Sequence, residues 1–147
     1  MPKIRVSTTV AAPRREVWQA VRDIGAHVRW MDDAEAIRIT SPQQEGVGTT
    51  FVCDTRLGPF RVRDAMEVVQ WREGRSMTVR HSGLVKGWGR FRLQGRGAKT
   101  RFTWEERLRF PWWMGGPVTA RLAALVLVRV WRRNLANLKA LVESGGI

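Results

Sequence analysis

Three ionisable residues, Asp64, His81 and Glu106, have the types and positions that could do chemistry in this chain. Each falls on the apolar face of a predicted strand, because hydrophobic residues precede or follow it at two-residue spacing. A histidine beside a carboxylate could bind the polar end of a ligand, or act as acid and base in an aldol-type cyclisation or dehydration. The alternative is a satisfied polar cluster in the core or at the open end of a sheet, and the ordinary frequency of such clusters favours it.

Two glycines share this predicted face. A hairpin turn at residues 95–98 would set Gly87 opposite Glu106 on the neighbouring strand. A three-residue turn after His81 would set that histidine beside Gly87, so that the three residues form one row across the sheet. Gly87 and Gly89 would remove side chains from the face and so open volume in front of the row.

The elements that must hold these residues in place follow from the periodicity of the chain. Helical spacing predicts a short helix between Pro13 and Gly25, a second short piece at Ala26–Trp30 and a long helix from about Pro117 to Glu143. Alternation with a period of two predicts strands at residues 3–10, 35–40, 48–57, 59–71, 75–81, 85–94 and 99–110. Short, glycine-rich connections favour an antiparallel meander and one α+β domain over residues 1–147. A curved sheet of about seven strands would wrap around the long helix, with the short helices at one end and a cavity between helix and sheet.

Composition narrows the class of protein and of chemistry. The 147-residue chain is 44% hydrophobic and carries 26 Lys and Arg against 13 Asp and Glu, which indicates a basic globular domain. Cys53 is the only cysteine, which excludes an internal disulfide and, with only two histidines, argues against a protein-built zinc site. Tyrosine is absent, so no phenol can serve as acid or base. The start has no signal-like apolar segment and no apolar run approaches the roughly 20 residues of a membrane span, so we expect a cytoplasmic protein.

Several segments, taken in order, resemble a known superfamily. They are the opening VAAPRREVWQAVRDI, the pair Trp30-Met31, GVGTTF, DAMEVVQW, TRFTWEERLRFPWWMGGP and the terminal RVWRRNLANLKALVE. Over nearly the whole chain this order resembles the SRPBCC superfamily, also called START-like or Bet-v-1-like, and within it the bacterial polyketide cyclase/dehydrase-like and lipid-transport-like members. The resemblance implies a helix-grip fold around a hydrophobic ligand cavity, without a metal or nucleotide cofactor. It leaves the chemistry open, since the superfamily includes cyclases, lipid carriers and pure binding proteins.

Strand and helix phase, with this resemblance, indicate which residues line the cavity. The candidates are Trp30, Phe51, Met66, Val79, Gly87, Gly89, Phe91, Phe102, Trp104, Trp112, Trp113, Leu127 and Trp131. The adjacent Trp112 and Trp113 could form a ligand portal or rest in a lipid headgroup layer, or they could pack beneath the start of the helix. The first half of the final helix is apolar almost all round, so it needs a second partner: a cavity ligand, a dimer mate or a membrane.

The positive charge indicates anionic partners of low specificity. Basic residues are spread over predicted helix and strand outer faces, without a helix-turn-helix, an RNP-type aromatic strand or a basic arm, so we expect no sequence-specific nucleic-acid binding. The first hypothesis is a protein that binds or carries a hydrophobic small molecule or lipid. The second is a cyclase or dehydratase acting on an aromatic or polyketide substrate. The third is non-specific nucleic-acid or weak anionic-membrane association, and a homodimer stays open.

Overall fold

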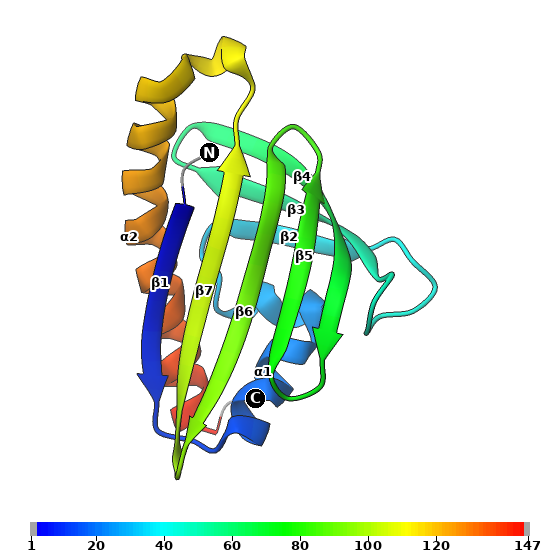
Figure 1. Cartoon of the computed structure of the whole chain (residues 1–147), viewed down its shortest axis with the longest axis vertical. Helices are drawn as coiled ribbons and strands as arrows, with labels where there is room; N and C mark the ends of the chain where they lie inside the picture. The colour runs from blue at the N-terminus through cyan, green and yellow to red at the C-terminus, as the bar shows by residue number, and fades with distance from the viewer. Residues whose placement is uncertain (1–2, 146–147) are drawn as a thin grey trace.

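The computed structural model describes residues 3–145, which form a curved antiparallel sheet, two α-helices and two 3₁₀ helices (Figure 1). In chain order the elements are β1 (Lys3–Val10), α1 (Arg14–Arg22), η1 (Ile24–Arg29), β2 (Ala34–Ile39), β3 (Thr50–Leu57), β4 (Phe60–Arg72), β5 (Ser76–Ser82), β6 (Lys86–Arg96), β7 (Lys99–Arg109), η2 (Trp112–Met114) and α2 (Gly116–Glu143). The strands are ordered β1-β7-β6-β5-β4-β3-β2 across the sheet. This architecture confirms the predicted α+β class and helix-grip arrangement, and it adds η2, which the sequence did not indicate.

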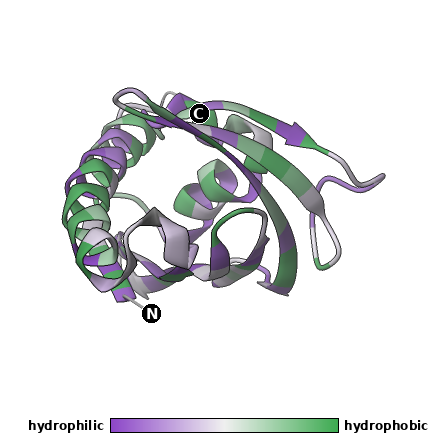
Figure 2. Cartoon of the chain, turned by 90° about the horizontal axis from the view of Figure 1, so that it is seen from above, coloured by the Kyte–Doolittle hydropathy of each residue, from purple (hydrophilic) through white to green (hydrophobic). Residues whose placement is uncertain are grey.

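The long helix α2 lies along one side of the curled sheet (Figure 2), and residues of both line an interior space. It packs mainly against β1, and its buried residues recur at helical spacing on one face. They are Leu127, Trp131, Asn134, Leu135, Leu138 and Val142. Fully burying each such leucine contributes about 1.5–3 kcal/mol, so this face attaches the helix to the sheet. Neither α-helix in the described residues combines the length and hydrophobicity that crossing a membrane requires.

The helices α1 and η1 close one end of this space. Trp18, Val17 and Val21 of α1 are buried against the sheet and η1. Just beyond η1, Trp30 is only 1% exposed and its indole contacts the rings of His27, Phe91, Phe102 and Trp104. The closed end of the fold is therefore a dense aromatic core.

The register between β6 and β7 differs from the predicted one by two residues. The strands remain paired as far as Arg96 and Lys99, so the hairpin turn has two residues in place of the four expected at 95–98. As a result Gly89 lies opposite Glu106, and Gly87 lies opposite Leu108. The predicted row of His81, Gly87 and Glu106 is thus wrong for Glu106, although His81 does pair with Gly87. Because side chains alternate with a period of two, a two-residue shift leaves Glu106 on the inner face.

Gly87 also has a different role from the predicted one of opening volume. Its φ is +128°, a conformation that residues with a side chain rarely adopt. A Cβ added there would lie 1.9 Å from the carbonyl oxygen of Arg107 on β7. Gly87 is therefore required for the close approach of the β6 and β7 backbones.

We expect Gly87→Ala to lower the free energy of unfolding by about 3 kcal/mol or more, because it combines backbone strain with a backbone clash. Gly97→Ala is the matched control, since Gly97 also has positive φ but would meet nothing within 4 Å of an added Cβ. It should lose only about 1–2 kcal/mol. Urea unfolding of both variants measures the difference, and equal losses would contradict the proposed backbone contact.

Candidate functional site

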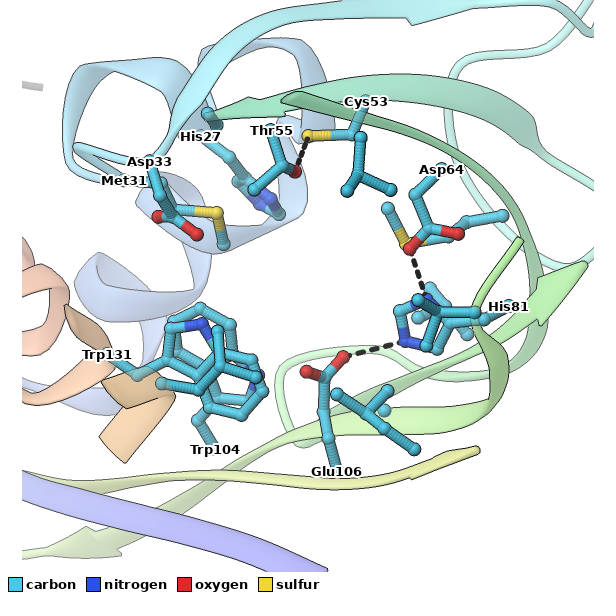
Figure 3. Close-up of a pocket in the computed structure, with 18 of the residues that line it drawn as sticks. His27, Met31, Asp33, Cys53, Thr55, Asp64, His81, Trp104, Glu106 and Trp131 are labelled. Atoms are coloured by element: carbon cyan, nitrogen blue, oxygen red, sulfur yellow. Dashed lines mark hydrogen bonds and ion pairs between the residues drawn. The ribbon is translucent and has the colours of Figure 1, made fainter. Parts of the chain in front are cut away.

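A cavity of about 180 Å³ lies between α2 and the inner face of the sheet (Figure 3). Its wall is mostly apolar and includes Ile37, Phe51, Leu57, Val62, Met66, Met77, Val79, Val85, Phe91, Trp104, Leu108, Phe110, Leu127 and Trp131. A dry apolar cavity of about 150 Å³ is enough to bind benzene. The volume therefore suits a small organic molecule.

Three ionisable side chains meet in this wall (Figure 3). His81 Nδ1 lies 2.6 Å from Asp64 Oδ2, and His81 Nε2 lies 2.8 Å from Glu106 Oε1. His81 and Glu106 are each only 6% exposed. The other carboxylate oxygen of Asp64, Oδ1, is buried without a hydrogen-bond partner. The residues singled out from the sequence thus form one hydrogen-bonded cluster, which we name the His81 cluster.

The His81 cluster reaches from β4 to β7 because β6 presents no side chain between its members. His81 belongs to β5 and Glu106 to β7, and alternate strands of a sheet are about 9.6 Å apart. Between them, Gly87 pairs with His81 and Gly89 pairs with Glu106. A Cβ at Gly89 would lie 2.4 Å from Glu106 Oε1, in the space that the carboxylate now occupies. Gly89 therefore makes room for the contact between histidine and glutamate.

The environment of the cluster shifts two pKa values. Burial alone would lower the pKa of His81, but hydrogen bonds to Asp64 and Glu106 and the charges of both carboxylates raise it to about 10. Burial raises the pKa of the Glu106 carboxyl, and the hydrogen bond from His81 only partly offsets that effect. The cluster therefore retains at neutral pH a proton that an isolated histidine would mostly have released.

Asp33 forms a second polar point on the cavity wall, across from the His81 cluster (Figure 3). Asn134, a fully buried residue of α2, donates from Nδ2 to Asp33 Oδ1 at 2.7 Å and accepts at Oδ1 from the backbone N–H of Asp32 at 2.9 Å. Burial raises the pKa of the Asp33 carboxyl. The sequence presents Asp32 and Asp33 as a loop before a strand, so the role of Asp33 was missed. A polar Asn134 within the apolar stripe of α2 is the signal that could have found it.

His27 also lines the cavity. Its sequence neighbours Trp30 and Met31 are compatible with a place at the cavity mouth, although a surface position is more usual for a histidine in a short helix. The side chain is buried, and Nε2 donates to the carbonyl oxygen of Val21 at 2.7 Å. Burial lowers the pKa of His27 to about 4, so the ring is neutral at ordinary pH. Cys53 lies on the wall as well, and burial raises the pKa of its thiol to about 11, which leaves it a poor nucleophile.

The structure divides the other candidate residues into three groups. Those on the cavity wall are Phe51, Met66, Val79, Gly89, Phe91, Trp104, Leu127 and Trp131. Trp30 and Phe102 instead lie in the aromatic core at the closed end, where their rings contact each other and Phe91, and Gly87 faces the β7 backbone. Trp112 and Trp113 lie outside the cavity, 86% and 60% exposed. Among the described residues, no group of His, Cys, Asp and Glu is arranged to hold a metal ion.

Solved structures share this fold at low sequence identity. TTHA0849 from Thermus thermophilus has a TM-score of 0.86 at 15% identity, covering 99% of this chain and 100% of its own. The Zhui aromatase/cyclase from Streptomyces sp. R1128 has a TM-score of 0.82 at 17% identity, with 99% and 96% covered. A START superfamily protein from Mycobacterium smegmatis has a TM-score of 0.78 at 15% identity, with 97% of each chain covered. These likenesses show the fold.

The family assignment comes from the sequence as a whole. No curated protein sequence matches the chain. A family model described as polyketide cyclase/dehydrase and lipid transport matches residues 1–143. The match confirms the resemblance to the SRPBCC superfamily, and because it covers almost the whole chain, the protein belongs to the polyketide cyclase/dehydrase and lipid transport family.

Proposed function

We propose that the protein binds a flat hydrophobic small molecule that carries at least one hydroxyl group. The observation that carries this proposal is the position of the His81 cluster, buried in the wall of an otherwise apolar cavity. An apolar cavity with a few convergent polar groups is the usual form of a small-molecule site. Membership of the polyketide cyclase/dehydrase and lipid transport family supports the same class of ligand.

The shape of the ligand is inferred from the aromatic part of the wall. Trp104 of β7 and Trp131 of α2 stack with ring centroids 4.5 Å apart and planes 15° from parallel. Phe91 contacts Trp104 edge to face at 5.3 Å. Aromatic rings prefer offset-stacked or edge-to-face contacts with other rings, and such contacts stabilise a pair beyond the area that they bury. A ligand with an aromatic or conjugated core therefore fits this wall.

The hydroxyl group is inferred from the second oxygen of Glu106. One oxygen, Oε1, is engaged by His81, whereas the other points into the cavity (Figure 3). The oxygen of an ionised carboxylate only accepts hydrogen bonds, so its partner on a ligand must be a donor such as O–H. A ligand O–H would donate a hydrogen bond to this oxygen. That bond would fix the orientation of the ligand in the cavity, and it would make the site prefer a ligand with a hydroxyl group over a hydrocarbon.

The second candidate function is that of a cyclase or dehydratase. The way in which the His81 cluster shares its protons favours this function. Each of its two short contacts needs one proton, so the cluster holds two protons on three basic groups and carries a net charge of −1. The second proton can reside on the imidazole or on Glu106 without changing that charge. Transfer over 2.8 Å therefore switches Glu106 between base and acid.

An aldol condensation would use both states of Glu106. As carboxylate it would take the proton from a carbon next to a substrate carbonyl, and the resulting enolate would form a C–C bond to a second carbonyl carbon. The alkoxide so formed would take the proton back from Glu106. Loss of water would then transfer another proton from carbon to Glu106, and Glu106 would pass that proton to the departing hydroxide as the C–O bond breaks, which regenerates the carboxylate. The similarity in fold to the Zhui aromatase/cyclase supports this candidate.

Filling the cavity tests ligand binding. We expect Val79→Trp to lower the affinity for a neutral naphthylamine dye about tenfold or more, because the new indole would occupy the cavity that Val79 lines. Val69→Trp is the matched control, because Val69 is 40% exposed and does not line the cavity. The affinity of this variant for the dye should equal that of the wild type. Dye fluorescence titration measures both affinities. Equal dye binding by the two variants would contradict a site in this cavity.

Replacement of Glu106 separates the two functions. If the protein only binds, Glu106→Gln should weaken a naphthol about tenfold and leave a naphthalene of the same size unaffected, because only the naphthol donates a hydrogen bond. If it is an enzyme, the rate should fall about 10²- to 10⁴-fold with little change in substrate affinity. Gly89→Ala should reproduce either effect by displacing the carboxylate from its place beside His81. Titration calorimetry and turnover of a linear polyketide analogue are the measurements, and wild-type values for Glu106→Gln in both would contradict a role for this residue.

The raised pKa of His81 predicts how stability depends on pH. Because the folded-state pKa of about 10 exceeds the ordinary 6.5, the stabilisation is complete below pH 6.5 and is lost as pH rises toward 10. Between pH 6.5 and 9 we expect the wild type to lose a few kcal/mol of unfolding free energy, of the order of 1.36 kcal/mol per pH unit. The double variant Asp64→Asn with Glu106→Gln removes both carboxylates and should show a much smaller slope. Urea unfolding at each pH measures this, and parallel slopes would show that the cluster does not hold the extra proton.

A further inference from the structure

Exposed hydrophobic side chains gather at the end of the molecule opposite α1. They come from the start of β4, the β5–β6 loop, η2 and the first half of α2, which lie at the upper end in Figure 1. We name this set the apolar rim: Phe60, Leu84, Trp112, Trp113, Val118, Leu122, Leu125 and Val126. Exposed patches of this kind mark interaction surfaces, whereas isolated exposed hydrophobic residues do not.

The apolar rim adjoins one end of the cavity. In each of three segments, a residue of the cavity wall lies one or two positions along the chain from a residue of the rim. Val62 follows Phe60, Val85 follows Leu84, and Phe110 precedes Trp112. A partner on the rim would therefore lie next to the space that holds the ligand.

Positive charge accompanies the rim, and acidic residues are missing from the same stretch of sequence. From Arg107 to Val142 the sequence contains no Asp or Glu, and its basic residues are Arg107, Arg109, Arg121, Arg129, Arg132, Arg133 and Lys139. Arg121 is exposed within the apolar half of α2, and Arg129, Arg132 and Arg133 are exposed two to four turns further along. The other rim segments carry Arg61 beside Phe60 and Lys86 near Leu84.

We propose that the apolar rim docks on the surface of an anionic lipid bilayer. Tryptophan is favoured at the boundary between headgroups and acyl chains, where Trp112 and Trp113 would insert beside Leu122 and Val118. The arginines would lie at the level of the headgroups, where each basic residue near an anionic surface adds attraction. A second copy of the chain fits less well, because it would bring two basic surfaces together with no acidic residue in the rim half of α2 to pair with them.

Vesicle sedimentation tests this proposal. With vesicles of phosphatidylcholine containing about 30% phosphatidylglycerol, the wild type should bind at least about tenfold more tightly than with phosphatidylcholine alone. Leu122→Asp should lower that affinity about tenfold or more, because it places a charge in the rim. Val47→Asp is the matched control, since Val47 is as exposed as Leu122, at 62% and 59%, but lies in the loop between β2 and β3. It should bind vesicles almost as the wild type does.

A charge-reversal pair separates docking through the rim from diffuse attraction to the whole basic surface. Arg121→Glu should weaken vesicle binding more than Arg72→Glu, which makes the same change at an exposed site at the far end of β4. The proposal would be overturned if Leu122→Asp and Val47→Asp weakened vesicle binding equally, or if Arg121→Glu and Arg72→Glu did. So would a wild-type dimer in light scattering that Leu122→Asp converts to a monomer, with no binding to vesicles. The dye titrations that test the cavity are done without lipid. A failure of vesicle binding would therefore leave the proposed ligand site untouched.

Discussion

The contact between His81 and Glu106 across β6 is the constraint on which the rest of the site depends. Two strands separated by a third can join their side chains only where the middle strand has none, and Gly89 provides that gap. The contact in turn restricts the sheet. Sliding β7 along β6 would leave a buried carboxylate and a buried imidazole without partners, which is far less favourable than losing apolar packing. The same three groups that could act on a ligand therefore also hold the register of the sheet that forms its cavity.

The sequence was sufficient to place Asp64, His81 and Glu106 on one face, because a period of two survives an error of two residues in register. It was not sufficient to identify which glycine faces Glu106. That pairing depends on the length of the β6–β7 turn, and the strands continue further into the turn than alternation alone indicates. Fold class was predictable for a similar reason, since the order of elements and their connections leave few topologies.

Residues brought to the site by tertiary packing were beyond this kind of prediction. His27 is buried because η1 folds beneath the sheet, and Asp33 acquires its role from Asn134, which is distant in the chain. Trp30 and Phe102 are aromatic residues that could line a cavity wall, but their rings pack on each other and on Phe91 in the core. Local periodicity reports which face of a strand is inward, whereas the choice between core and cavity is made by the elements that cover that face.

The pairing of β1 with β7 has a consequence for synthesis of the protein. Lys3 pairs with Arg107 and Val10 with Thr100, so β1 has no partner strand until about 90 to 104 further residues have been made. Strands β3 to β7 can form successive hairpins through turns of two or three residues, whereas β1 must wait for β7 and for α2, which packs on it. Contacts between distant parts of a chain slow folding and leave apolar strands exposed in the meantime. The enclosed interior is therefore among the last parts of the molecule to form, and the apolar face of β1 is the part of a nascent chain most in need of protection from aggregation.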